Sequence, residues 1–239
     1  MLVTTKAIVI SAIKFSEADL IVKCFTESDG LKTYLCRNIL KSKKSKLKAS
    51  LFQPLNQLEL VANHKNKGAM EYIREAKVAS AYQTFHSNIY KSSIVIFLSE
   101  ILRNTIKEEE QNIELFKFLE NRFNWLEAHD SVSNFHIYFL VDYTRFLGFY
   151  PNRPKNELSF FNLQEGIFQE EKSGQYCVSG ENVDILKQIL GTKFDDQQLL
   201  KLTHSKRNDF LNLVLLYYDL HLQNLKKPKS LSVLNELFS

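Results

Sequence analysis

The spacing of hydrophobic residues changes near residue 78, and this change constrains the fold more than any other feature of the chain. Before it, apolar and β-branched residues form short runs, such as residues 5–13 and 20–25. After it, apolar residues recur every three or four positions, as in residues 94–102. Strands favour the first pattern and amphipathic helices the second. The sequence therefore predicts an α+β protein with two domains, residues 1–78 and 79–239.

Five short strands are predicted in the first domain. They cover residues 5–13, 20–25, 31–36, 57–62 and 69–74, with a short helical insert near residues 47–52. A small closed β-barrel of the OB-fold type has this number of strands, and we predict that fold. An open antiparallel sheet would give much the same pattern, so the strands alone leave both arrangements open.

Amphipathic helices dominate the second domain. Helical patterns cover residues 94–102, 113–126 and 135–149, and another runs from residue 211 to 225. Between them, residues 151–180 contain short apolar runs separated by Gly and Pro, which predicts a small β insertion. The longest apolar run has six residues, whereas a membrane helix needs about 20. We therefore expect no membrane partner and a cytoplasmic location.

The sequence offers no pattern typical of a metal centre or an active site. Its three cysteines stand singly at positions 24, 36 and 177, which fits neither a disulfide framework nor a four-cysteine zinc site. No phosphate-binding loop, His-Glu-x-x-His pair or Gly-x-Ser-x-Gly motif is found. The acidic run Glu108–Glu110 is typical of a solvated helix end. We predict no metal, no cofactor and no enzymatic activity.

Positive charge is concentrated in the first part of the chain. Residues 1–80 hold 14 Lys and Arg against 7 Asp and Glu, whereas residues 81–239 hold 17 against 20. Such a charge imbalance favours a polyanionic partner for the first domain. The segment Arg37–Lys48 contains six basic residues and no acidic one. Because each phosphate that it neutralises would release counterions, nucleic acid is favoured over a merely solvated loop.

Aromatic rings near such a segment would stack on bases if they were exposed. Phe15, Phe25 and Tyr34 are the candidates, although a core position is the more common place for each of them. The predicted DNA contacts are Arg37, Lys41, Lys43, Lys44, Lys46, Lys48, Lys6 and Tyr34.

Several segments, taken in order, carry a family resemblance. They are Lys6–Ile10, Ser16–Val22, Phe25-Thr26, Gly30, the basic segment from Arg37, Gln53–Leu55, Phe146–Pro151, Tyr217–His221 and Ser230–Leu234. Together they resemble the bacterial RecO family of recombination mediator proteins over nearly the whole chain. The resemblance implies an N-terminal OB-fold and a helical C-terminal domain. It also implies binding of single- and double-stranded DNA, annealing of complementary strands, and help in loading RecA recombinase onto DNA coated with single-strand-binding protein.

The resemblance further implies two protein partners, RecR and the acidic C-terminal tail of the single-strand-binding protein. Arg122 and Arg145, on aromatic-rich helices, are candidate cations for the carboxylate of that tail. Asn38 stands where the family often has Gly, and Asn tolerates a positive φ better than most residues. Many members carry a four-cysteine zinc module after their Gly-Tyr-x-Pro pattern. Here that stretch holds only Cys177, so aromatic pairing is expected to hold the β insertion instead.

One alternative function comes from a different class. The basic barrel of a protein-interaction adaptor would bind acidic peptides rather than nucleic acid. DNA binding with a large salt dependence and tolerance of base sequence would favour the mediator, whereas saturable binding to an acidic tail peptide alone would favour the adaptor.

Overall fold

The chain divides into two compact units. The computed structural model describes residues 1–41, 47–65, 69–107, 109–152, 158–223 and 225–238. Unit 1 comprises residues 1–129 and 228–230, and unit 2 comprises residues 130–227 and 231–239. The sheet of unit 1 ends at Val78, where the first domain was predicted to end, but two further helices belong to the same compact unit.

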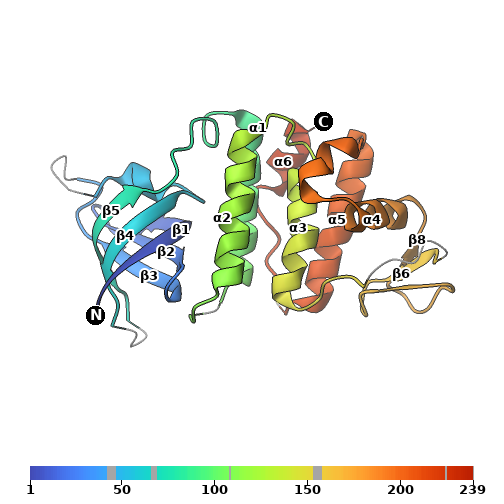
Figure 1. The fold of residues 1–239 in the computed structure, drawn as a ribbon, viewed down its shortest axis with the longest axis horizontal. Coiled ribbons are helices and arrows are strands. Elements are labelled where there is room, and N and C mark those ends of the chain that lie inside the picture. The colour runs from blue at the N-terminus through green and yellow to red at the C-terminus, as the bar shows by residue number, and fades with distance from the viewer. Residues whose placement is uncertain (42–46, 66–68, 108, 153–157, 224, 239) are drawn as a thin grey trace. The chain divides into compact units, whose positions relative to one another are not determined.

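Unit 1 is built on a five-stranded antiparallel sheet (Figure 1). Its elements are β1 (Leu2–Lys14), β2 (Leu20–Thr26), β3 (Gly30–Cys36), the 3-10 helix η1 (Ala49–Phe52), β4 (Gln57–Asn63) and β5 (Tyr72–Val78). The strands lie in the order β3-β2-β1-β4-β5. The first four strands and η1 fall where the sequence predicted them, whereas β5 begins at Tyr72 rather than at residue 69.

One face of the sheet forms the core of unit 1. Alternate residues of a strand point to the same side, and β1 supplies this core while pairing with both β2 and β4. A bulge between Val9 and Ser11 shifts its register with β2. The buried side chains include Val9, Val22, Cys24, Tyr34, Cys36, Leu58 and Leu60. Burial of each large aliphatic side chain contributes about 1.5–3 kcal/mol.

The two edge strands meet at one point. Tyr34 in β3 forms a parallel bridge with Glu71, the residue before β5. The Leu35 N–H donates to the Glu71 carbonyl at 3.0 Å, and the Glu71 N–H donates to the Thr33 carbonyl at 2.8 Å. A single bridge is less than a full ladder between strands, so the antiparallel sheet is established and the closed barrel stays a prediction.

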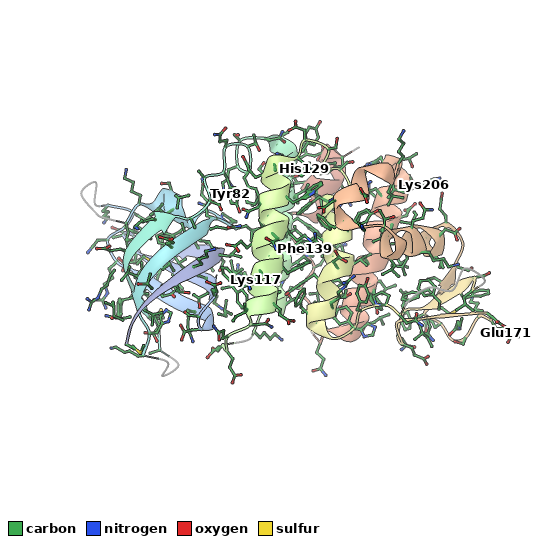
Figure 2. All side chains as sticks on the ribbon, viewed as in Figure 1. Tyr82, Lys117, His129, Phe139, Glu171 and Lys206 are labelled. Atoms are coloured by element: carbon green, nitrogen blue, oxygen red, sulfur yellow. The ribbon has the colours of Figure 1, made fainter. Side chains whose placement is uncertain are left out.

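Two helices complete unit 1, namely α1 (Ile89–Thr105) and α2 (Ile113–Ala128). Asn88 and Asn112 cap them with side-chain oxygens that accept backbone N–H groups, which replaces hydrogen bonds missing from a helix start. The Phe25 and Phe116 rings stack 6.2 Å apart and join β2 to α2. Figure 2 labels Tyr82 in the connection before α1 and Lys117 on α2.

Residues 228–230 bring the chain back to unit 1 from unit 2. The N–H and hydroxyl groups of Ser230 donate to Glu100 Oε2 on α1, at 3.2 and 3.1 Å. This carboxylate therefore anchors a segment 130 residues further along the chain.

Unit 2 is mostly helical. Its helices are α3 (Phe135–Leu147), α4 (Glu181–Gly191), α5 (His204–His221) and α6 (Leu231–Leu237), with the 3-10 helix η2 (Phe194–Leu199). The helix α3, predicted over residues 135–149, ends at Leu147 and is capped by Gly148, which has a left-handed φ of 84°. The Tyr218 hydroxyl donates to the Leu140 carbonyl at 2.7 Å and ties α5 to α3. None of the helices described here has both the length and the apolar character needed to cross a membrane.

The β insertion lies where the sequence predicted it. Three strands, β6 (Phe160–Asn162), β7 (Ile167–Gln169) and β8 (Cys177–Ser179), form an antiparallel sheet in the order β7-β6-β8. The Phe161 and Phe168 rings lie 4.8 Å apart across it, in agreement with the predicted aromatic pairing. Across the described parts of the chain, no three His, Cys, Asp or Glu residues form a group that could hold a metal ion.

Candidate nucleic-acid interface

The basic segment begins at a fixed turn after β3. Asn38 adopts a φ of 56°, so it occupies the left-handed conformation that the sequence predicted it would tolerate. Its N–H donates to Asp19 Oδ1 at 2.8 Å, and the Leu40 N–H donates to the Ala18 carbonyl at 3.0 Å. These bonds tie the turn to the β1–β2 loop and leave the neighbouring Arg37 side chain exposed.

The basic residues in the described part of the segment are exposed to solvent, whereas Ile39 is buried in the core of unit 1. Lys41 Nζ pairs with Glu17 Oε2 at 2.7 Å, and both side chains are well exposed, so solvent screens this ion pair. Lys48 is also exposed and directly precedes η1. Lys43, Lys44 and Lys46 lie outside the described residues.

Arg37 forms a cation–π pair with Tyr72, a residue that the sequence did not single out. Its guanidinium lies 5.7 Å from the centroid of the Tyr72 ring, within the range of a favourable contact. Tyr72 is 39% exposed, so part of its ring remains open to solvent. The Tyr34–Glu71 bridge holds the start of β5 beside β3 and thereby brings the two side chains together. In the sequence, the local indication that Tyr72 could belong to the interface was its position two residues before the basic Arg74.

The assignment of Tyr34 as a base-stacking residue is wrong. Its side chain is completely buried, and its hydroxyl lies 2.7 Å from His64 Nε2. His64 Nδ1 in turn lies 2.9 Å from Asp29 Oδ2. Burial raises the pKa of the Tyr34 hydroxyl well above its ordinary value. Phe25 is buried as well, whereas Phe15 is 58% exposed and stays a candidate.

Lys6 is engaged within unit 1. Its Nζ donates to Glu120 Oε1 on α2 at 2.8 Å. The hydrogen bond and the negative charge of Glu120 raise the pKa of Lys6. The ammonium group is therefore paired within unit 1, although its side chain is 45% exposed. Its role as a phosphate contact stays a prediction.

A hollow of about 450 Å³ is lined by residues of β2, β3 and the segment just before β5. Its lining includes Lys23, Lys32, Thr33, Met70, Glu71 and Glu109. Lys32 Nζ donates to the Glu109 carbonyl at 3.3 Å. Because two lysines are balanced by two glutamates, the hollow offers space near the interface but no net positive charge.

Arg122 and Arg145, predicted to bind a peptide carboxylate, belong to different units. Arg122 on α2 of unit 1 lies 5.2 Å from the centroid of the Phe118 ring. Arg145 on α3 of unit 2 donates to the Tyr150 hydroxyl at 2.7 Å and pairs with Asp142 at 3.4 Å. Each guanidinium therefore has its own neighbours, and no shared site is assigned to the two.

Two family models match this chain. Recombination protein O N terminal matches residues 1–82, and Recombination protein O C terminal matches residues 86–231. The chain belongs to the recombination protein O (RecO) family. DNA repair protein RecO of Christiangramia forsetii is 55% identical over 238 residues. Those of Flavobacterium johnsoniae and Flavobacterium psychrophilum are 47% and 46% identical, over 240 and 239 residues. Each match covers the whole of both chains.

The family resemblance predicted from the sequence is thus confirmed. Membership of the RecO family supports a role in DNA repair and recombination. The N-terminal model ends at residue 82 and the C-terminal model begins at residue 86, both within the connection between β5 and α1. The basic segment and the Arg37–Tyr72 pair therefore both lie within the part matched by the N-terminal RecO model.

Proposed function

We propose that this RecO-family chain is a recombination mediator. It binds single- and double-stranded DNA, anneals complementary strands and helps to load RecA recombinase onto DNA coated with single-strand-binding protein. The observation that carries the proposal is the exposure of Arg37, Lys41 and Lys48 in the basic segment, with Arg37 beside the partly exposed Tyr72 ring. Family membership supports the same role. The proposal includes no catalytic step and no cofactor.

The chemistry of the segment favours contacts with the DNA backbone. Arg37, Lys41 and Lys48 are exposed and offer charge to phosphates, which carry no sequence information. A base that stacks on the open part of the Tyr72 ring would bring its phosphate toward Arg37. Stacking of this kind tolerates every base because each has a π face. Annealing of arbitrary complementary strands requires such tolerance.

We also propose that the sheet closes into an OB-fold barrel. The Tyr34–Glu71 bridge supports closure because it joins the two edge strands of the order β3-β2-β1-β4-β5. OB-folds bind oligonucleotides with the face of strands 2 and 3 and with the loops between strands 1 and 2 and between strands 4 and 5. The exposed Phe15 follows β1, and Tyr72 begins β5. Both residues lie next to the loops that would meet the ligand if the sheet closes into an OB-fold, which supports the proposal.

We propose RecR and the acidic tail of single-strand-binding protein as partners, and the cytoplasm as the location. Family membership alone supports these assignments. Arg122 and Arg145 remain candidates for the tail. They should be tested singly, because they belong to different units.

The first experiment measures DNA affinity at several salt concentrations. If the six basic residues of the segment each neutralise one phosphate of a single strand, log affinity should fall against log salt with a slope of roughly −4. Replacing Lys43, Lys44 and Lys46 together by Ala should flatten that slope by about two. A matched variant replaces Lys226, Lys227 and Lys229, which are exposed and lie far along the chain. Equal flattening by both triple variants would show that net charge acts rather than the segment.

The second experiment tests the mediator role itself. Complementary strands precoated with single-strand-binding protein are mixed with the full chain, and duplex formation is followed with time. Faster annealing by the wild type, with a clear loss in the Lys43, Lys44 and Lys46 variant, supports the proposal. If the chain binds only the acidic tail peptide and neither binds nor anneals DNA, the mediator proposal is rejected in favour of the adaptor.

A further inference from the structure

A hollow of about 270 Å³ in unit 2 lies at the starts of two helices. Besides two leucines, its lining consists of Ser131, Ser133, Asn134, Gln197, Lys201 and Arg207. Asn134 is the N-cap of α3, and Arg207 is the fourth residue of α5. Helix N-termini carry partial positive charge. With two basic residues and no acidic one in its lining, the hollow has the electrostatics of an anion site.

Arg207 provides a buried cation there. Its side chain is nearly inaccessible, at 8% exposure. It donates to Asn134 Oδ1 at 3.1 Å, to the Phe238 carbonyl at 3.3 Å and to the Leu202 carbonyl at 3.0 Å. All three acceptors are neutral, and no carboxylate in the described parts of the chain pairs with this guanidinium. Burial lowers the pKa of Arg207, which reflects the cost of a buried charge without a counter-charge.

Gln197 adds a requirement that a simple anion does not meet. Its Nε2 donates to the Phe194 carbonyl at 3.1 Å, which fixes the orientation of the amide group. Its Oε1 is buried and has no hydrogen-bond partner among the described residues. A buried acceptor left without a donor is costly. The preferred ligand therefore carries negative charge for Arg207 and Lys201 and also a proton for Gln197 Oε1.

We propose that this hollow binds inorganic phosphate as hydrogen phosphate. At neutral pH this anion keeps at least one P–O–H group, which would donate to Gln197 Oε1 while its other oxygens accept from Arg207, Lys201 and the serine hydroxyls. Sulfate has similar shape and charge but no proton to donate. A phosphate monoester is mostly unprotonated at neutral pH, since its second pKa is about 6. The site lies in unit 2, whereas the proposed DNA interface lies in unit 1.

The test is calorimetric titration of the full chain with inorganic phosphate, sulfate and thymidine 5′-monophosphate, at neutral pH and constant ionic strength. Saturable phosphate binding is expected, about tenfold tighter than that of sulfate or the nucleotide, because those two leave a buried acceptor unpaired. Gln197→Leu should bring the phosphate-to-sulfate preference close to one. Lys201→Ala should weaken phosphate binding about tenfold through loss of a charge-assisted hydrogen bond.

Lys206→Ala is the matched control. Lys206 precedes Arg207 on α5 (Figure 2) but pairs with Glu181 and does not line the hollow. Phosphate affinity should be unchanged in this variant, and circular dichroism checks that every variant is folded. Equal affinity of the wild type for sulfate and phosphate, equal effects of Lys201→Ala and Lys206→Ala, or no saturable binding would each overturn the proposal.

Discussion

The buried imidazole of His136 should make the chain lose stability in mild acid. His136 is the second residue of α3 and is 1% exposed. Burial, together with the positive charge of Arg207, lowers its pKa from 6.5 to about 3. Between these two values the unfolded chain binds a proton that the folded chain does not. Stability therefore rises with pH across this window, and it is lost as the pH falls below about 6.5.

The size of the effect follows from the two pKa values. At pH 5 the unfolded imidazole is almost fully protonated, whereas the folded one is neutral. Linkage then gives a loss of about 2 kcal/mol between pH 7 and pH 5 from this one group. His86 is also depressed in pKa by burial and acts in the same direction. The pH dependence of the wild-type unfolding free energy therefore contains contributions from both histidines.

A His136→Gln variant separates the two contributions. Gln keeps a polar side chain of similar size but does not titrate. The substitution changes the unfolding free energy by the same amount at every pH, so this change cancels when the pH dependences of the two proteins are compared. Urea unfolding followed by circular dichroism at pH 5, 6 and 7 gives the free energy of unfolding for both proteins. The variant should lose about 2 kcal/mol less than the wild type between pH 7 and pH 5. Parallel curves for the two proteins would refute the reasoning.

Two further substitutions test the interface and the packing of unit 2. Tyr72→Ala should weaken binding of single-stranded DNA by about 1–3 kcal/mol in a fluorescence anisotropy titration, and Tyr72→Phe, which keeps the ring, should bind nearly as the wild type does. Unchanged binding by the Ala variant would exclude stacking on this residue. Gly166→Ala should destabilise unit 2 by about 1–3 kcal/mol more than Gly174→Ala in urea unfolding. The two glycines have similar φ values of 69° and 71°, but only at Gly166 would a Cβ meet the Tyr217 hydroxyl, at 2.6 Å. Equal losses would contradict the predicted clash.

The sequence predicted those strands whose hydrophobic pattern marks one buried face. In β2 and β3 every second residue is buried over most of the strand, and their bounds are nearly right. No residue of β5 is fully buried, so the strand has no such pattern and its start was misplaced. In unit 2, α4 was missed although Val183, Leu186 and Ile189 recur at helical spacing. That helix was predictable from the sequence.

The sequence was enough to predict the basic residues of the candidate site but not which aromatic residue lies exposed beside them. The run of basic residues is local, so the sequence alone located it. Whether Tyr34 or Tyr72 is exposed depends on distant residues, because the Tyr34 hydroxyl meets His64, which lies 30 residues away. The ion pair of Lys6 could not be predicted for the same reason, since its partner Glu120 lies 114 residues further along. Such pairings arise from the fold and leave no mark on the local pattern.

Because residues 228–230 return to unit 1, the way in which the chain is cut after residue 129 determines whether unit 1 keeps all its residues. The chain passes from one unit to the other three times, after residues 129, 227 and 230. A fragment that stops at His129 would lack Ser230 and leave the Glu100 carboxylate without the two bonds that it accepts. A protease nick after His129 would instead leave Ser230 present, on the second fragment. A nicked chain, or a circular permutant opened at that connection, therefore retains the donor groups for Glu100 that a simple truncation removes.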